Sequence, residues 1–170
     1  MYKQHLFFRA DGGRDDGLGH IKRCISLYKT IKKNFKFCKP EFIVNKNNPT
    51  SIEILKNNDC KYLTVDGKVN TKKEILNLIK ILSSYKIKIL IIDSKRIDKN
   101  YISILKKCSK VVIFEDEKKY NVNPNLVINP NLWAKKLYKD LSPKLLGLKY
   151  NTIPSKFFKK KAFNVKSNKI

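Results

Sequence analysis

The sequence predicts an α/β fold with a mostly parallel sheet, and three observations carry that prediction. Short apolar segments alternate along the 170 residues with segments whose apolar positions recur every three to four residues. Ile87–Ile92 is nearly all apolar, which is typical of a central parallel strand. Four of the six glycines fall between Gly12 and Gly19, after the first apolar segment and before the first helical pattern. Such alternation forms right-handed crossovers and a Rossmann-like, three-layer domain.

The first third of the chain contains two expected strands around a helix. Met1–Arg9 includes three consecutive apolar residues and is expected to be a strand. Ala10–Leu18 is a glycine-rich loop, and Gly19–Lys33 has the 3.6-residue apolar spacing of a helix. Pro40–Val44 is a short apolar strand, and the asparagine-rich segment Asn45–Pro49 is a turn.

The middle of the chain repeats this order. A helix capped by Thr50 or Ser51 is expected to end near Asn57, because hydroxyl side chains satisfy the free amides of a first helical turn. Lys61–Val65 is the next expected strand. Thr71–Ser84 is an amphipathic helix, with its first residue and the glutamate three positions later in the spacing of a capping box.

The last part of the chain continues the alternation after the apolar strand Ile87–Ile92. Asp98–Cys108 is an expected helix, and Lys110–Phe114 and Leu126–Ile128 are expected strands. Leu145–Ile153 is expected to be a last extended segment. Residues 1–156 are thus expected to form one domain, and residues 157–170 a basic tail or linker.

Polar residues follow the expected strands directly. Because ligands of parallel sheets bind beyond the carboxyl ends of the strands, these residues should share one rim with His20. They are Asp11, Asp93, Glu115, Asp116 and Asn129.

The composition limits the classes of partner and the compartment to be expected for this protein. The net charge of +24 is compatible with nucleic-acid binding, but also with the lysine-rich codon bias of an AT-rich genome. Arginine, which reads phosphates and base edges best, is scarce, and the lysines are spread along the chain, so nucleic acid is not the expected partner. The four cysteines form no CxxC pair and are expected to be reduced thiols that bind no metal. With no membrane span and no secretory signal in the sequence, a cytoplasmic protein is expected.

His20 is the expected catalytic residue. Gly17-Leu-Gly-His-Ile-Lys22 is only part of a dinucleotide fingerprint, because Lys22 occupies the third glycine position, so no nicotinamide or flavin cofactor is expected. His20 falls in the first turn of a helix, where the helix dipole disfavours the imidazolium form. A neutral imidazole facing a ligand can act as a general base, and the alternative is a local structural cap.

The side chains around the loop leave alternatives open. Asp11 can orient His20 or bind a sugar hydroxyl. Arg9 and Arg23 can anchor the loop to carboxylates or face a substrate. Asp15 and Asp16 are expected to be solvated turn residues.

The loop and three later segments carry a family resemblance. Phe8-Arg-Ala-Asp-Gly-Gly followed by Gly17-Leu-Gly-His-Ile-Lys-Arg-Cys24 resembles the opening of the UDP-trideoxy-diacetamido-altropyranose hydrolases of pseudaminic acid biosynthesis and of related spore-coat polysaccharide proteins. Ile92-Asp93-Ser94, Asn129-Pro130-Asn131 and Leu145-Leu-Gly-Leu-Lys-Tyr150 resemble later motifs of that family, in the same order. The segment after Tyr150 departs from the family, because its expected Arg and Glu are missing.

The resemblance implies the N-terminal half of a GT-B fold, with His20 as the base that activates water against the anomeric carbon of a UDP-sugar. In that family a second half supplies most of the nucleotide pocket, so the expected partner is a separate C-terminal half or a second copy of this chain. The expected substrate-binding residues are Arg9, Asp11, Gly17, Gly19, Arg23, Asp93, Ser94 and Asn129. The alternatives are a non-catalytic binding module of the same fold and half of a glycosyltransferase.

Overall fold

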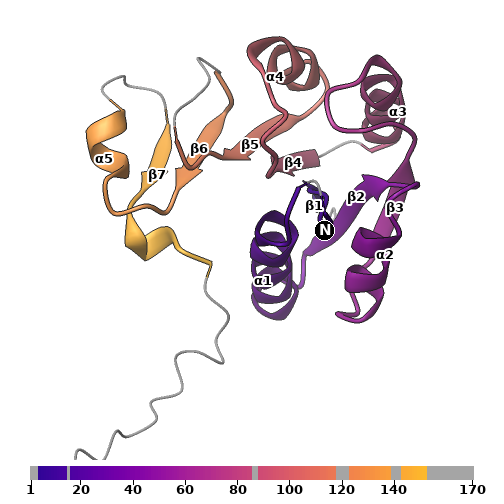
Figure 1. Cartoon of the computed structure of the whole chain (residues 1–170), viewed down its shortest axis with the longest axis horizontal. Helices are drawn as coiled ribbons and strands as arrows, with labels where there is room; N and C mark the ends of the chain where they lie inside the picture. Colours follow the sequence, from indigo (N-terminus) through magenta and orange to yellow (C-terminus); the bar gives the residue numbers. More distant parts are fainter. Residues whose placement is uncertain (1–3, 15, 86–87, 118–122, 139–142, 153–170) are drawn as a thin grey trace, which may run out of the picture.

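The fold is a parallel sheet between two layers of helices. The computed structural model describes residues 4–14, 16–85, 88–117, 123–138 and 143–152. Over these residues, seven strands form one sheet in the order β3-β2-β1-β4-β5-β6-β7, and all neighbouring strands run parallel. Helices lie against both faces of the sheet (Figure 1). The predicted Rossmann-like α/β class is therefore confirmed.

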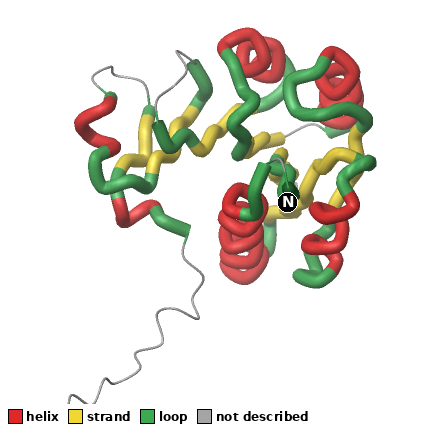
Figure 2. The backbone as a smooth tube through the Cα atoms, in the orientation of Figure 1, coloured by secondary structure: helices red, strands yellow, loops and turns green. Residues whose placement is uncertain are grey.

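The elements alternate along the chain much as the hydrophobic pattern predicts (Figure 2). In order they are β1 (Gln4–Arg9), α1 (Gly19–Asn34), β2 (Cys38–Asn45), α2 (Pro49–Lys56), β3 (Tyr62–Val65), α3 (Lys72–Ser83), β4 (Lys88–Ile92), α4 (Lys99–Lys106), β5 (Lys110–Phe114), β6 (Leu126–Asn129), α5 (Ala134–Leu137), β7 (Lys144–Leu146) and the 3-10 turn η1 (Leu148–Tyr150). Each expected strand and helix overlaps one of these elements.

The start of α2 differs from the prediction. Its N-cap is Asn48, not Thr50 or Ser51, and the Asn48 side chain accepts a hydrogen bond from the Ser51 amide at 3.0 Å. Pro49 takes the first helical position, where its fixed φ suits the helix and its missing N–H costs nothing. The helix therefore begins two or three residues earlier than expected.

The start of α3 confirms half of the predicted capping box. Thr71 caps the helix by accepting from the Glu74 amide. The Glu74 side chain does not return to the Thr71 amide, which donates to Lys68 instead. Its carboxylate turns into the protein and binds Arg9, because a buried guanidinium requires a counter-charge.

The carboxyl-terminal part departs most from the prediction. The extended segment expected over Leu145–Ile153 is only the short strand β7, which Gly147 ends with a positive φ of 101° before the turn η1. The short helix α5 was not predicted, because four residues are too few to show a helical period. Ile153 and the expected tail at residues 157–170 lie outside the described residues.

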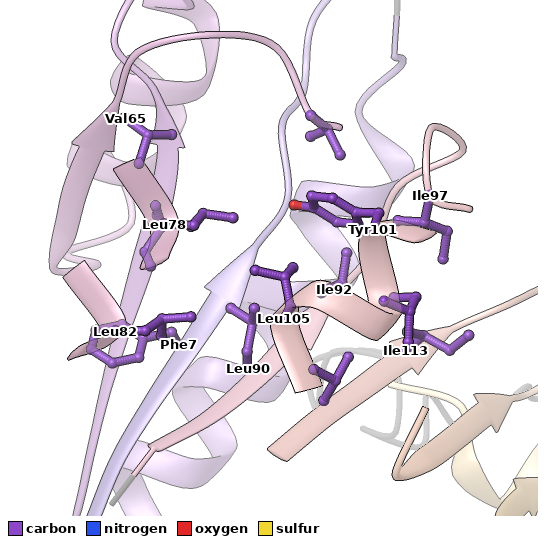
Figure 3. Close-up of a cluster of buried hydrophobic side chains, with 14 of the residues drawn as sticks. Phe7, Val65, Leu78, Leu82, Leu90, Ile92, Ile97, Tyr101, Leu105 and Ile113 are labelled. Atoms are coloured by element: carbon purple, nitrogen blue, oxygen red, sulfur yellow. The ribbon is translucent and has the colours of Figure 1, made fainter. Parts of the chain in front are cut away.

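The core consists of two apolar clusters, one on each face of the sheet. Alternate residues of a strand point to opposite faces, so Phe7 packs in one cluster and Phe8 in the other. Figure 3 shows the cluster that contains Phe7, with Leu90 and Ile92 of β4 and with Leu78 and Leu105 of the helices above. These layers hold the carboxyl ends of β1, β4 and β5 at one edge. Within the described residues, no helix has both the length and the apolar character needed to cross a membrane.

Candidate functional site

The glycine loop between β1 and α1 folds as a tight hairpin. Gly13 and Gly17 exchange two backbone hydrogen bonds, of 3.1 and 2.8 Å. Both have positive φ, 144° and 71°, which L side chains rarely adopt. Gly12 is needed for a different reason, since a Cβ there would lie 2.6 Å from the Ile21 side chain. The loop thus packs directly on α1 and fixes where that helix begins.

His20 lies in the first turn of α1 and contacts Asp93 at the end of β4. His20 Nδ1 and Asp93 Oδ1 are 2.6 Å apart. The Asp93 side chain is 1% exposed and that of His20 is 14% exposed. Because a carboxylate only accepts hydrogen bonds, Nδ1 donates to Asp93, and in the neutral imidazole Nε2 then carries the lone pair. The structure thus brings together two residues that the sequence placed on the same rim.

Arg23, one turn further along α1, fixes Asp93 from its other side. Its Nε and Nη2 donate to the two Asp93 oxygens at 2.7 Å each, and Nη1 donates to Asp116 at 2.8 Å. Its guanidinium also lies over the Phe114 ring, 4.7 Å from the centroid. Burial alone would lower the pKa of Arg23, but the hydrogen bonds to the two carboxylates outweigh it and raise that pKa above its ordinary value. Arg23 is therefore a permanent cation that holds Asp93 in place.

This arrangement suits a general base. Asp93 stabilises the imidazolium once a proton is taken, and it fixes the ring orientation. Cys24 Sγ lies 3.9 Å from Asp93, and burial, together with that carboxylate, raises the pKa of the Cys24 thiol well above its usual range. Cys24 is thus a neutral thiol and not a nucleophile.

A cavity opens beside His20, here called the His20 pocket. It holds about 490 Å³ of space, part of it open to solvent. Its lining residues are His20, Asp93, Ser94, Lys95, Ile97, Phe114, Glu115, Asp116 and Glu117. Ser94, expected to bind substrate, lines the cavity and accepts from the Arg96 amide through its hydroxyl. Carboxylates dominate the charged lining, which favours a hydroxyl-rich or amino-bearing group over a phosphate at this position.

Arg9 does not face a ligand, contrary to its place among the expected substrate-binding residues. Its side chain is fully buried, with Nη1 2.8 Å from Asp11 and Nε 2.8 Å from Glu74. Tyr101 also donates to Glu74 at 2.9 Å. Because Arg9 follows Phe8 in the strand, it points to the face covered by α3 and α4, away from His20. Of the two roles expected for Arg9, it therefore has the one that anchors the loop to carboxylates.

Asp11 does not orient His20 either. Its carboxylate binds Arg9 and accepts from the Asn45 amide at 3.0 Å, so it joins the ends of β1 and β2. Asp93 has the orienting position instead. Asp16, expected to be solvated, pairs with Arg96 at 3.1 Å, and Asp15 lies outside the described residues.

The remaining expected site residues lie on the rim with different contacts. Gly17 closes the hairpin, and Gly19 is the first residue of α1. Asn129 is buried at the end of β6, and its side-chain oxygen accepts from the Asn131 amide at 3.1 Å. Asn131 in turn donates to the Asp116 carbonyl, which links this turn to the His20 pocket. Asn129 itself does not line that pocket.

Sequence reasoning missed two contacts near the site. Tyr138 donates to Glu115 at 2.7 Å, and burial together with that carboxylate raises the pKa of Tyr138. The second is the contact of Arg96 with Asp16, although the place of Arg96 just after the apolar strand that precedes Asp93 could have put it on the rim. Within the described residues, no three His, Cys, Asp or Glu side chains are grouped to hold a metal ion.

No protein-family model matches the chain, and no curated protein matches it. Among solved structures the chain is similar to BdcA in complex with NADPH, with 6% identical residues and a TM-score of 0.42. The alignment covers 76% of this chain and 71% of that one. A likeness at this level says nothing about what the present chain binds, and the fold class rests on the strand order and pairing described above.

Proposed function

We propose that this chain carries the catalytic base of a nucleotide-sugar hydrolase and forms the sugar-side half of its active site. The observation that carries the proposal is the 2.6 Å contact between His20 Nδ1 and the buried Asp93, beside a cavity. The motif resemblance at the glycine loop, at Asp93 and at Asn129 supports the UDP-sugar class of substrate. The carboxylate-rich lining of the His20 pocket supports a sugar there.

The proposed reaction is a displacement at the anomeric carbon. Water attacks that carbon while His20 Nε2 takes its proton, and the bond from the anomeric carbon to the diphosphate oxygen breaks. The bonding electrons leave with the nucleoside diphosphate, and the products are the free sugar and that diphosphate. Asp93 stabilises the imidazolium that forms, and Arg23 keeps Asp93 oriented.

Hydrolysis of a panel of UDP-sugars in ¹⁸O-labelled water tests the proposal, with the chain alone and with any candidate second half. Attack at carbon puts the label in the sugar, whereas attack at phosphorus puts it in the diphosphate. His20→Gln should lower turnover by about 10²- to 10⁴-fold without lowering the melting temperature. Lys22→Gln, an exposed position on the same helix, is the matched control and should keep the parent rate.

Three outcomes would contradict the proposal. Parent-rate hydrolysis by a folded His20→Gln variant would place the base elsewhere. Binding of a UDP-sugar without turnover, with every second half tried, would favour a non-catalytic binding module. Turnover that requires an added sugar hydroxyl acceptor would favour a transferase.

A further inference from the structure

A second cavity lies on the other side of the glycine loop from the His20 pocket, and nothing in the proposed function uses it. This loop pocket holds about 750 Å³ of space, part of it open to solvent. It is formed at the carboxyl ends of β1 and β2 by the loop at Gly12–Gly13, the start of α2 and the segments around Val69 and Arg96. The position is one where parallel sheets bind ligands.

The charged lining of the loop pocket is opposite in character to that of the His20 pocket. Its cationic lining residues are Arg14, Lys68 and Arg96. Its described acidic residues are Asp11, which shares the buried Arg9 with Glu74, and Asp16, which pairs with Arg96. Among the described residues, three cationic side chains thus line the loop pocket against two acidic ones, which favours an anion.

One wall of the loop pocket is held rigidly. Gly12 donates from its amide to Ser51 Oγ at 2.8 Å, and its carbonyl accepts from Asn48 Nδ2 at 2.8 Å. These bonds tie the loop to the first turn of α2, so Gly13 lies next to Thr50: a Cβ on Gly13 would be 3.9 Å from the Thr50 Cβ. A wall fixed in this way keeps its donors oriented before a ligand arrives, which lowers the entropic cost of binding.

The first turn of α2 adds donors to this wall. The first hydrogen bond within α2 runs from the Ile52 amide to the Asn48 carbonyl. The Thr50 amide lies before it in the chain and therefore has no acceptor within the helix. Thr50 lines the loop pocket together with Arg14 and Arg96. Planar guanidinium groups and a helix start are a combination that recognises phosphoryl oxygens.

We propose that the loop pocket is a phosphate subsite, which binds the phosphoryl group of an anionic ligand through Arg14, Arg96 and the start of α2. The His20 pocket and the loop pocket share the segment after β4, since Ser94 and Lys95 line the first and Arg96 lines the second. A ligand with an uncharged sugar and a phosphate would therefore find a matching pocket on each side of one loop. The subsite concerns binding alone and does not depend on His20 being a base.

Titration of the whole chain with inorganic pyrophosphate at 0.15 M salt, followed by calorimetry and by amide NMR, tests the subsite. Arg96→Gln and Arg14→Gln should each weaken binding by about tenfold, the loss expected for one charge-assisted contact. Lys33→Gln removes the same charge from an exposed position in the last turn of α1, and should change binding less than twofold. The Gly13 and Thr50 amides should shift on binding, whereas the His20 amide should not.

His20→Gln separates this inference from the proposed hydrolysis, because it should bind pyrophosphate as tightly as the parent does. The same titration is then done with UDP and with glucose 1-phosphate. Tighter binding of one of them shows whether the phosphate that the subsite binds belongs to a nucleotide or to a sugar phosphate. Equal losses in the arginine variants and in Lys33→Gln would show only general attraction to a basic protein and would overturn the subsite. Shifts confined to His20 and Asp93, or no binding at millimolar pyrophosphate, would also overturn it.

Discussion

Arg9 and Arg23 lie on either side of the same glycine loop and each binds two carboxylates, yet their surroundings differ. Arg9 is fully buried between Asp11 and Glu74, behind the loop. Arg23 is partly exposed at the rim, where it joins the buried Asp93 to the half-buried Asp116. In the first ion network Arg9 and Glu74 are closed off from solvent and only Asp11 reaches the loop pocket, whereas the second network borders the His20 pocket through both of its carboxylates.

The difference follows from the element that carries each arginine. Arg9 is the last residue of β1, so strand alternation fixes which face of the sheet it enters. Arg23 lies on α1 one turn after the loop, on the side that faces the ends of β4 and β5. Arginine near a glycine loop is thus weak evidence of a substrate contact, and the strand or helix position decides between an anchor and a site residue.

The largest expected effect comes from breaking the buried network. Arg9→Met leaves Asp11 and Glu74 inside the protein without a cation, which should lower the free energy of unfolding by about 3–5 kcal/mol. Urea denaturation measures this loss. Arg23→Met should cost less, about 1–3 kcal/mol, because Asp116 can be solvated. A larger loss of unfolding free energy for Arg23→Met than for Arg9→Met would show that the network at the rim contributes more to stability than the buried one.

Replacing Glu74 by a neutral residue tests the buried network further, with a smaller expected effect on stability. Burial raises the pKa of Glu74 in the folded protein, although Arg9 and Tyr101 oppose the shift. A raised folded pKa means that the native state binds the proton more tightly, so this contribution to stability is present at low pH and is lost as the pH rises through the folded pKa. The stability of Glu74→Gln relative to the parent should therefore shift in favour of the variant as the pH rises from 4 to 7. Urea midpoints that diverge in the opposite sense would show that Arg9 dominates.

The sequence predicted the sheet and its rim well, because both depend on local patterns. The apolar run of β4 and the position of Asp93 directly after it place that carboxylate at the carboxyl edge without any tertiary information. The 2.6 Å contact with His20 could not be predicted, since it depends on how α1 packs on the sheet. The burial of Arg9 and the turn of Glu74 toward it were missed for the same reason: two charged residues 65 positions apart carry no pattern that pairs them.

The central claim is that Asp93 holds His20 with its proton on Nδ1 and leaves Nε2 open as a base. Nitrogen-15 NMR of the imidazole rings at neutral pH tests this directly, because the chain has only two histidines and His5→Gln assigns the signals. We expect a protonated Nδ1 and a bare Nε2 for His20, with loss of that preference in Asp93→Leu. A proton on Nε2 in the parent, or the same ring state in both proteins, would contradict it.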